Sequence, residues 1–266
     1  MHPTARERLR RIQHDCCRSL GFRSTPAKPH FLGIGTQKGG TSSLYHLLKQ
    51  HPDVYLPTSK EQHYFTTHYQ RGDDWYEEQF ADAQPGQARG EITPYYLFHP
   101  EAPARIHGYR PGMLLIALLR DPVERTLSQY FHARRHGFEP LELQAALAAE
   151  ENRLASGDPY SHQKHSYLSR SRYAEQLARF ETLFGPDQLL VMRSEDLFQK
   201  PEDCWMKLQH FLGLRPQQLN ASLPWINAGQ GEASDVSDEI RSQLRRELAE
   251  TVEFVHQRYG IHWDWD

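Results

Sequence analysis

The sequence predicts an α/β fold of three layers, with a central, mainly parallel sheet flanked by helices. Three observations support this fold: four strand-type runs, helix-type segments between them, and a glycine-rich turn after the first run. The first and third runs are apolar almost throughout, which is typical of parallel strands that helices cover on both faces. A chain of 266 residues can bury a sizeable core. We expect one main domain over residues 30–266.

The expected strands are, in chain order, residues 31–35, 88–93, 113–120 and 188–194. We expect helices after the glycine-rich turn, near residues 99–108, and from Pro122 and Pro201 onward. Ser237 is a candidate N-cap of a last long helix that ends at Gly260. Ligands of parallel sheets bind beyond the carboxyl ends of the strands, and we expect the functional residues there.

Residues 1–29 indicate a short helix and a linker ahead of the main domain. Leu9, Ile12, Cys16 and Leu20 fall on one helical stripe. Packing of this stripe against the main domain is favoured over binding to a membrane or a partner. Arginines occupy positions where a secretory signal would need an apolar stretch, so we do not expect export by that route.

The composition argues against several classes of protein. A formal net charge of −3 is not that of a globally basic nucleic-acid-binding protein, so any anion site must be local. The longest apolar run, residues 113–119, is far shorter than the roughly 20 residues that span a bilayer. Three cysteines without framework spacing are typical of free thiols in a reducing compartment. We therefore expect a cytoplasmic protein without a transmembrane segment.

No metal site is expected. His132 and His136 have the spacing of a zinc-binding helix, but Ala133 stands where a metalloprotease needs its glutamate. We interpret this segment as a solvated helix face.

A glycine-rich segment, "GIGTQKGGTSSLYHLL" (33–48), is the first candidate anion site. Gly35 and Gly40 have the glycine spacing of a nucleotide phosphate loop. However, Thr41 occupies the position of the usual lysine, and the only lysine of the loop is Lys38. A strand, a turn and a helix in this order direct backbone N–H groups and the positive end of the helix dipole to one point, which favours an anion.

Other residues of the loop fit the same role. Gly39 and Gly40 allow close approach of the backbone or a positive φ. Thr41, Ser42 and Ser43 add hydroxyl donors, and one of them can cap the helix. An ordinary glycine-rich turn is the weaker interpretation.

The displaced lysine separates this loop from that of a P-loop kinase. In such kinases the Lys contacts the β- and γ-phosphates, the next Ser or Thr binds Mg²⁺, and a Walker-B Asp completes the metal site. Here the apolar strand at 113–119 is followed by Arg120, a cation at the place of that acid. A nucleotide kinase with an altered loop remains an alternative. Lys38 could neutralise charge on a transferring group without a metal.

"LLRDPVERTLSQYFH" (118–132) is a second candidate anion site. Arg120 falls at the carboxyl end of a predicted strand, Asp121 can cap the next helix, and Pro122 suits its first position. Ser128 lies two turns along that helix. An Arg at a strand end and a hydroxyl on the following helix can hold a phosphate together. Two separate phosphate sites fit a bisphosphorylated nucleotide better than ATP.

"SKEQHYF" (59–65) contains the candidate bases. Glu61 and His63 are two positions apart, so they would point the same way on an extended segment. Either could take a proton from an acceptor hydroxyl. The alternative for Glu61 is a solvated carboxylate or an ion pair with Lys60.

"GTQKGGTSSLYHLLKQHPDV" followed by "KEQHYF" resembles the sulfotransferases that use 3′-phosphoadenosine 5′-phosphosulfate (PAPS), in particular bacterial members and heparan sulfate sulfotransferases. The resemblance implies a P-loop-like α/β fold in which a lysine placed as Lys38 serves the 5′-phosphosulfate. It also implies that Arg120 and Ser128 bind the 3′-phosphate. Glu61 matches the proposed base of the 3-O-type enzymes.

The resemblance implies a PAPS-dependent enzyme that releases adenosine 3′,5′-bisphosphate (PAP) and transfers a sulfuryl group to an acceptor hydroxyl or amine, without a metal. Tyr173 and Arg170 match positions that approach the donor or the acceptor. Trp225 is assigned to the adenine only from its position in the chain. A protein that binds the nucleotide without turnover remains a further alternative.

The acceptor side departs from the family pattern. In "RGEITPYYLFHP" (89–100), Ile92 stands where the glycan enzymes usually have a lysine, which disfavours a sulfated or carboxylated sugar acceptor. Tyr95, Tyr96 and Trp75 could form an aromatic acceptor wall, with core packing as the alternative. The sequence does not identify the acceptor.

Overall fold

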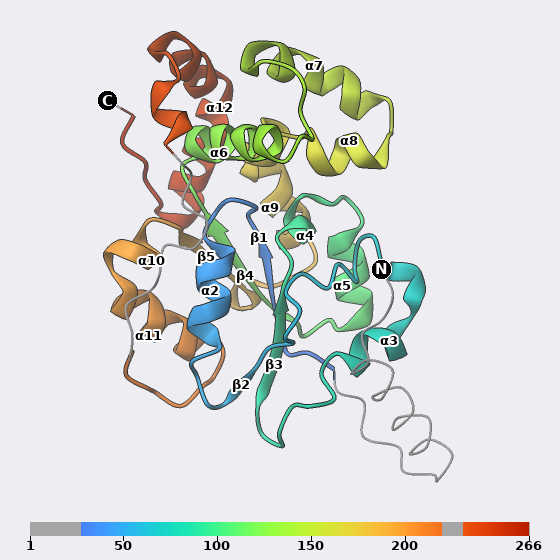
Figure 1. Cartoon of the computed structure of the whole chain (residues 1–266). Helices are drawn as coiled ribbons and strands as arrows, with labels where there is room; N and C mark the ends of the chain where they lie inside the picture. Colours follow the sequence, from blue (N-terminus) through green and yellow to red (C-terminus); the bar gives the residue numbers. More distant parts are fainter. Residues whose placement is uncertain (1–27, 220–230, 266) are drawn as a thin grey trace.

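The computed structural model describes residues 28–219 and 231–265. Its centre is a five-stranded parallel sheet in the order β2-β3-β1-β4-β5 (Figure 1). The strands are β1 (Phe31–Gly35), β2 (Val54–Tyr55), β3 (Ala88–Ile92), β4 (Leu114–Leu119) and β5 (Leu189–Arg193). The four predicted strands are confirmed. The two-residue strand β2 was not predicted, because so short a run carries no periodic signal.

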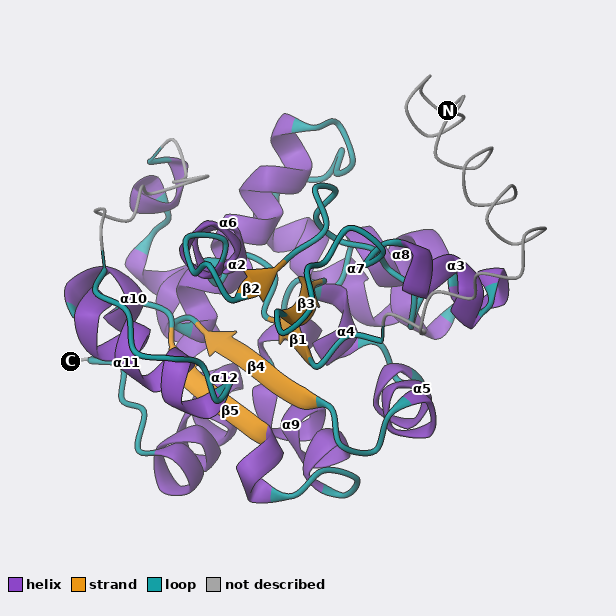
Figure 2. Ribbon diagram, turned by 90° about the horizontal axis from the view of Figure 1, so that it is seen from below, coloured by secondary structure: helices purple, strands orange, loops and turns teal. Residues whose placement is uncertain are grey.

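The helices between the strands are α2 (Thr41–Leu48), α3 (Asp73–Glu78), α4 (Tyr95–Phe98), α5 (Ala102–Tyr109), α6 (Pro122–Arg135), α7 (Leu143–Ala155), α8 (Pro159–Lys164) and α9 (Tyr173–Glu181). After β5 come α10 (Asp196–Gln199), α11 (Pro201–Phe211) and α12 (Asp238–Tyr259). Figure 2 shows the strands in the middle of the molecule with helices around them. The predicted three-layer α/β fold is confirmed.

Alternating residues of β4 build the two cores. Leu115, Ala117 and Leu119 pack with residues of α4, α5, α9 and α12. Ile116 and Leu118 point to the other face and pack with α2, α10 and α11. Burying each of these Leu and Ile side chains contributes about 1.5–3 kcal/mol, which holds the central strand firmly between the helical layers.

The order of the strands brings distant loops together. From β1 the chain runs to β2 and β3 on one side of the sheet, and β4 and β5 lie on the other side. The carboxyl ends of β1 and β4 are therefore adjacent where the direction of the connections reverses, which is the usual ligand position in such sheets. In Figure 1, α6, α7 and α8 lie beyond this end of the sheet.

Two local predictions about helix ends are confirmed. Asp121 caps α6 through its Oδ1, which accepts from the N–H groups of Val123 (2.8 Å) and Glu124 (3.0 Å). Ser237 caps α12, and Gly260 ends it in the left-handed conformation. The predicted N-terminal helix, with Leu9, Ile12, Cys16 and Leu20, lies outside the described residues.

The described part of the chain has no helix that combines the length and apolarity needed to cross a membrane.

Candidate active site

The glycine-rich loop after β1 is packed tightly on β4. The N–H of Thr36 donates to the carbonyl of Leu118 (2.8 Å), and the N–H of Gly39 donates to that of Thr36 (3.0 Å). A Cβ on Gly39 would lie 2.7 Å from the Leu118 oxygen and 2.7 Å from Thr36 Cγ2. The position accepts only glycine, because the obstructing carbonyl belongs to the central strand.

Gly40, with φ 83°, is the N-cap of α2, and no side chain caps this helix. The prediction that a hydroxyl of Thr41, Ser42 or Ser43 is the cap was therefore wrong. Because Gly40 is the N-cap, α2 begins at Thr41, and all three hydroxyl residues lie inside its first turn. The N-terminal end of a helix of this kind is suited to an anion. Thr41 and Ser43 are buried there, and Ser42 is half-buried.

Lys38 lies in a concentration of positive charge. Burial, followed by the charges of Arg135 and Arg120, lowers the pKa of Lys38 to about 8. The charge of Lys60 adds to this effect. Such a cluster of cations is unfavourable alone and favours an anion among them.

Arg120 joins the two predicted anion motifs. Its guanidinium, about one third exposed, donates from Nη1 to the carbonyl oxygen of Lys38 (3.4 Å), and Nη2 lies 3.8 Å from Glu124 Oε2. The hydroxyl of Tyr173 donates to the backbone oxygen of Arg120 (2.8 Å), while the Tyr173 ring is fully buried. Tyr173 therefore fixes the turn that carries Arg120.

Helix α6 places Ser128 on the same side as these cations. Ser128 follows Glu124 by four residues and is half-buried, and Arg135 at the end of the helix acts on the charge of Lys38. Arg125, on the same helix, has a structural role instead. It is fully buried, with Nε donating to Ser171 Oγ (2.5 Å) and Nη1 donating to Gln129 Oε1 (2.6 Å), so it fastens α6 to its neighbours.

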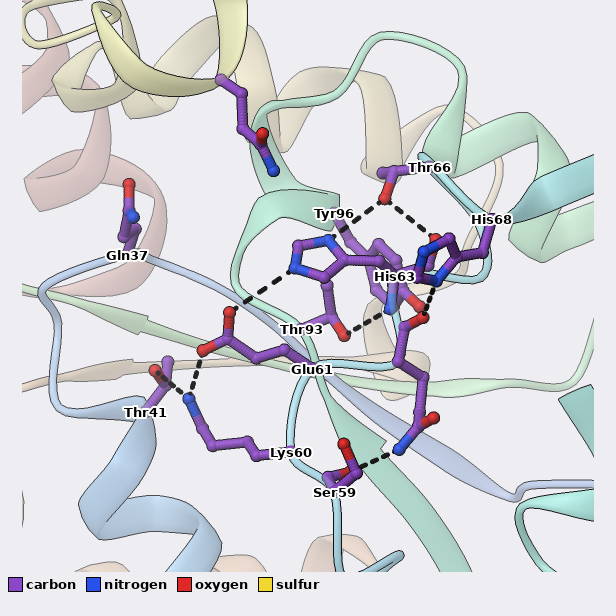
Figure 3. Close-up of polar contacts among 12 residues, drawn as sticks. Gln37, Thr41, Ser59, Lys60, Glu61, His63, Thr66, His68, Thr93 and Tyr96 are labelled. Atoms are coloured by element: carbon purple, nitrogen blue, oxygen red, sulfur yellow. Dashed lines mark hydrogen bonds and ion pairs between the residues drawn. The ribbon is translucent and has the colours of Figure 1, made fainter. Parts of the chain in front are cut away.

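Glu61 lies between two cationic or polar partners next to the glycine-rich loop (Figure 3). Lys60 Nζ is 2.7 Å from Glu61 Oε1 and donates to Thr41 Oγ1 (3.4 Å). On the other side, His63 Nε2 is 3.6 Å from Glu61 Oε2. Burial alone would raise the pKa of Glu61, but the contact with His63 and the charge of Lys60 outweigh it and lower the pKa to about 2.

Three non-glycine residues of the described chain have positive φ: Lys38 (68°), Glu61 (64°) and His63 (54°). The predicted extended segment at Glu61 and His63 was therefore wrong, although the two side chains do approach each other. Left-handed backbone is unfavourable for such residues and persists where the surrounding structure imposes it, which is most often at functional sites. All three residues were predicted to be catalytic.

Comparison with known proteins identifies the family. A family model for the sulfotransferase domain matches residues 28–227. The chain belongs to the sulfotransferase family. It is 39% identical to the membrane-associated sulfotransferase kil1 of Dictyostelium discoideum, over 89% of this chain and 66% of that protein. It is 32% identical to the mouse heparan sulfate glucosamine 3-O-sulfotransferase 6, over 70% of this chain. The chain spans about half of that second relative, 53% of its length.

Solved structures agree with this assignment. A sulfotransferase from Alicyclobacillus acidocaldarius superposes with a TM-score of 0.75 and 27% identity, over 89% of this chain and 98% of that one. A mouse sulfotransferase in complex with PAP has a TM-score of 0.54 and 16% identity, over 93% of this chain and 90% of that one, and shows the common fold.

A buried network supports the acceptor-side loop of this sulfotransferase domain. The N–H of His63 donates to Thr93 Oγ1 (3.3 Å), and that hydroxyl donates to Glu91 Oε2 (2.7 Å). Glu91 is fully buried, and its Oε1 accepts from the hydroxyls of Tyr76 (3.2 Å) and Tyr96 (2.5 Å). Burial raises the pKa of Glu91. The network ties the strained loop at His63 to the core.

The aromatic residues suggested for an acceptor wall separate into different environments. Tyr96 is fully buried and belongs to the core. Trp75 packs against the same core and under Arg71. Tyr95 is buried, with its hydroxyl 2.7 Å from His162 Nδ1 and its ring 6.1 Å from that of His63. Tyr95 is thus the one of the three for which a ring contact with a candidate base is found.

Two cations near this loop were not singled out by their sequence motifs. Arg170 is buried and donates from Nη1 to Gln37 Oε1 (2.5 Å). Gln37 precedes Lys38, so this hydrogen bond supports the glycine-rich loop. Arg135 was included in a solvated helix face, yet it contributes to the charge around Lys38. The run of basic residues at the end of α6 was the available signal.

Trp225, assigned to the adenine, lies outside the described residues. Within residues 28–219 and 231–265, no group of three or more His, Cys, Asp or Glu side chains is arranged to hold a metal ion. His132 and His136 stack with ring centroids 4.2 Å apart.

Proposed function

We propose that the protein transfers a sulfuryl group from PAPS to an acceptor hydroxyl or amine and releases PAP. The observation that carries this proposal is the convergence of Lys38, Arg120 and Glu61 on one glycine-rich loop at the carboxyl ends of β1 and β4. A donor with phosphate at both ends of its ribose matches two anion sites better than a triphosphate does. The mouse sulfotransferase of the same fold was solved with PAP.

In the proposed reaction the acceptor oxygen or nitrogen forms a bond to sulfur while the bond from sulfur to the bridging oxygen of PAPS breaks. The Lys38 ammonium faces the bridging oxygen and neutralises the charge that develops on the leaving phosphate. The backbone N–H groups and the hydroxyls of Thr41, Ser42 and Ser43, with Gly39 and Gly40 allowing close approach, hold the 5′ end.

Arg120 and Ser128 hold the 3′-phosphate in this proposal, the guanidinium by charge-assisted hydrogen bonds. Tyr173 acts through the backbone oxygen of Arg120, which its hydroxyl holds. Trp225 remains our assignment for contact with the adenine.

Glu61 takes the proton from the hydroxyl or amine of the acceptor. His63 orients the Glu61 carboxylate or takes the proton from it in turn. A carboxylate with a pKa of about 2 is a weak base, but it is ionised at every working pH. The proton on the attacking oxygen or nitrogen becomes strongly acidic as the bond to sulfur forms, so a weak base suffices at that stage. The 3.6 Å contact between Glu61 and His63 leaves both groups near a common point.

The class of acceptor is open within this proposal. The relatives named for heparan sulfate glucosamine 3-O-sulfation act on a glycan by name, whereas Ile92 removes a cation that would suit a charged sugar. We place the protein in the cytoplasm from its cysteines, although one relative is named membrane-associated. Labelled PAPS and a panel of glycans, phenols, lipids and carrier-bound hydroxyls would identify the acceptor.

Isothermal titration with PAP tests the donor assignment. We expect saturable binding to the wild-type chain and to the exposed control variant Arg246→Ala, and weaker binding to Arg120→Ala. Equal binding by Arg120→Ala and the control would overturn the assignment. Mg²⁺-dependent binding of ATP in preference to PAP would instead favour the kinase alternative.

A further inference from the structure

Glu124 is a carboxylate inside the proposed site for the 3′-phosphate. Its Oε2 lies 3.8 Å from Nη2 of Arg120. On α6 it precedes Ser128 by four residues, so both side chains leave the same face of the helix. A phosphate held by Arg120 and Ser128 would therefore lie close to the Glu124 carboxylate. Negative groups so near each other repel, and Glu124 alone would oppose the binding that Arg120 favours.

Arg241, in the first turn of α12, neutralises this carboxylate. Its Nη1 donates to Glu124 Oε1 at 2.5 Å, a much shorter contact than the 3.8 Å between Glu124 and Arg120. The side chains of Glu124 and Arg241 are 33% and 21% exposed, so water and salt screen the pair only in part. Glu124 is thus paired mainly with Arg241, which leaves the Arg120 guanidinium for another anion.

The position of Arg241 is fixed by contacts on both sides. Its Nη2 donates to the carbonyl of Ala233 (2.6 Å) in the segment before α12. Val123 and Leu127 of α6 belong to one buried apolar cluster with Leu244 of α12, and Figure 1 shows the two helices next to each other. The packing of α12 on α6 therefore brings the guanidinium to the carboxylate.

We propose that Arg241 is a positioning residue for donor recognition, because by neutralising Glu124 it leaves Arg120 available to the 3′-phosphate. This inference rests on the proposed function, in which Arg120 holds that phosphate. Arg241 does not contact the nucleotide itself and acts through Glu124. Without Arg241, the Glu124 carboxylate pairs with Arg120 and competes with the phosphate. Discrimination between nucleotides with and without a 3′-phosphate then depends on how α12 packs on α6.

The test compares PAP with adenosine 5′-phosphate, which lacks the 3′-phosphate, by isothermal titration into the full chain. Arg241→Gln should weaken PAP binding roughly fivefold and change the affinity for adenosine 5′-phosphate no more than about twofold. Arg246→Gln removes the same charge from an exposed position of the same helix and is the matched control. It should bind both nucleotides as the wild type does.

A double variant separates the charge of Arg241 from its structural contacts. Glu124→Gln combined with Arg241→Gln should bind PAP within about twofold of Glu124→Gln alone, because no carboxylate is left to neutralise. A purely structural role of Arg241, such as its hydrogen bond to Ala233, would instead be lost equally with and without Glu124. Equal losses in the two backgrounds would overturn the proposal, as would PAP binding by Arg241→Gln that equals that of the control.

Folding and the donor assignment are checked in the same samples. Circular dichroism and the binding of adenosine 5′-phosphate report whether each variant is folded. Arg241→Met, which keeps a long unbranched stem without the charge, repeats the comparison if Arg241→Gln does not fold. Failure of PAP to saturate the wild-type chain would overturn the donor assignment and this inference with it. PAP binding that depends on Arg120 but not on Arg241 would overturn this inference alone.

Discussion

The proposed donor side and the proposed acceptor side of the site are built in different ways. On the proposed donor side the backbone does most of the positioning, since Gly39 lies against the Leu118 carbonyl and Gly40, in the left-handed conformation, starts α2. On the acceptor side, side chains position one another: Lys60 and His63 hold Glu61, and Thr93 holds the loop at His63. The first arrangement tolerates few sequences, whereas the second can vary with the acceptor.

The largest effect is expected from Glu61→Gln, which removes the proposed base and keeps the shape. Sulfuryl transfer to the best acceptor of the panel should fall roughly 10²–10⁴-fold, with PAP binding unchanged. Rates with labelled PAPS and titration with PAP measure the two quantities. Glu202→Gln on the exposed side of α11 is the control, and a change no larger than that of the control would remove Glu61 from the reaction.

Lys38→Ala tests the donor side. The rate should fall roughly 10²–10³-fold because the leaving phosphate loses its cation during transfer. PAP binding should weaken much less, since the loop N–H groups and Arg120 remain. Lys207→Ala, at an exposed position, should behave as wild type. A loss confined to PAP binding would mean that Lys38 only binds the nucleotide.

Arg120→Ala should weaken PAP binding roughly 10- to 100-fold, the range for lost charge-assisted hydrogen bonds to one phosphate. Adenosine 5′-phosphate lacks the 3′-phosphate, so its affinity should differ little between the variant and the wild type. If both nucleotides lose affinity equally, Arg120 is not specific for the 3′ end.

The pH dependence of the transfer rate should distinguish the contribution of Lys38 from that of Glu61. Lys38 must be charged, so kcat/KM should fall tenfold per unit above a pKa of about 8. The negative charge of the bound donor favours the ammonium, so the corresponding fall in kcat should lie at higher pH. Glu61, with a pKa of about 2, contributes no acid limb between pH 5 and 8. Lys38→Arg should lose the alkaline fall, and its persistence would assign the fall to another group.

Thr93→Val is expected to have the smallest effect. The substitution removes the acceptor of the His63 N–H and one donor to Glu91, so the rate should fall roughly tenfold or less while PAP affinity stays the same. Thr93→Ser keeps the hydroxyl and should restore the rate. A variant that loses PAP binding as well would show that this network supports the whole site.

The sequence predicted the donor side better than the acceptor side, for physical reasons. The strand, the glycines and Lys38 are local in the chain, and Arg120 follows a long apolar strand, so both were visible as patterns. The left-handed turn at Gly40 and the positive φ of Glu61 depend on packing across the sheet. The contact between Arg170 and Gln37 joins residues 133 positions apart, which no local pattern reveals.

The backbone hydrogen bond from the Thr36 N–H to the Leu118 carbonyl helps to set the separation of the loop after β1 from the turn after β4. Each of these segments carries one of the two proposed phosphate contacts, so that bond helps to determine the distance between the two phosphate sites. Nucleotides whose two anionic groups are spaced differently, such as those phosphorylated at the 2′ position, would fit one segment and miss the other. Selection among nucleotides would then be a property of how two strands are paired, set before any side chain touches the ligand.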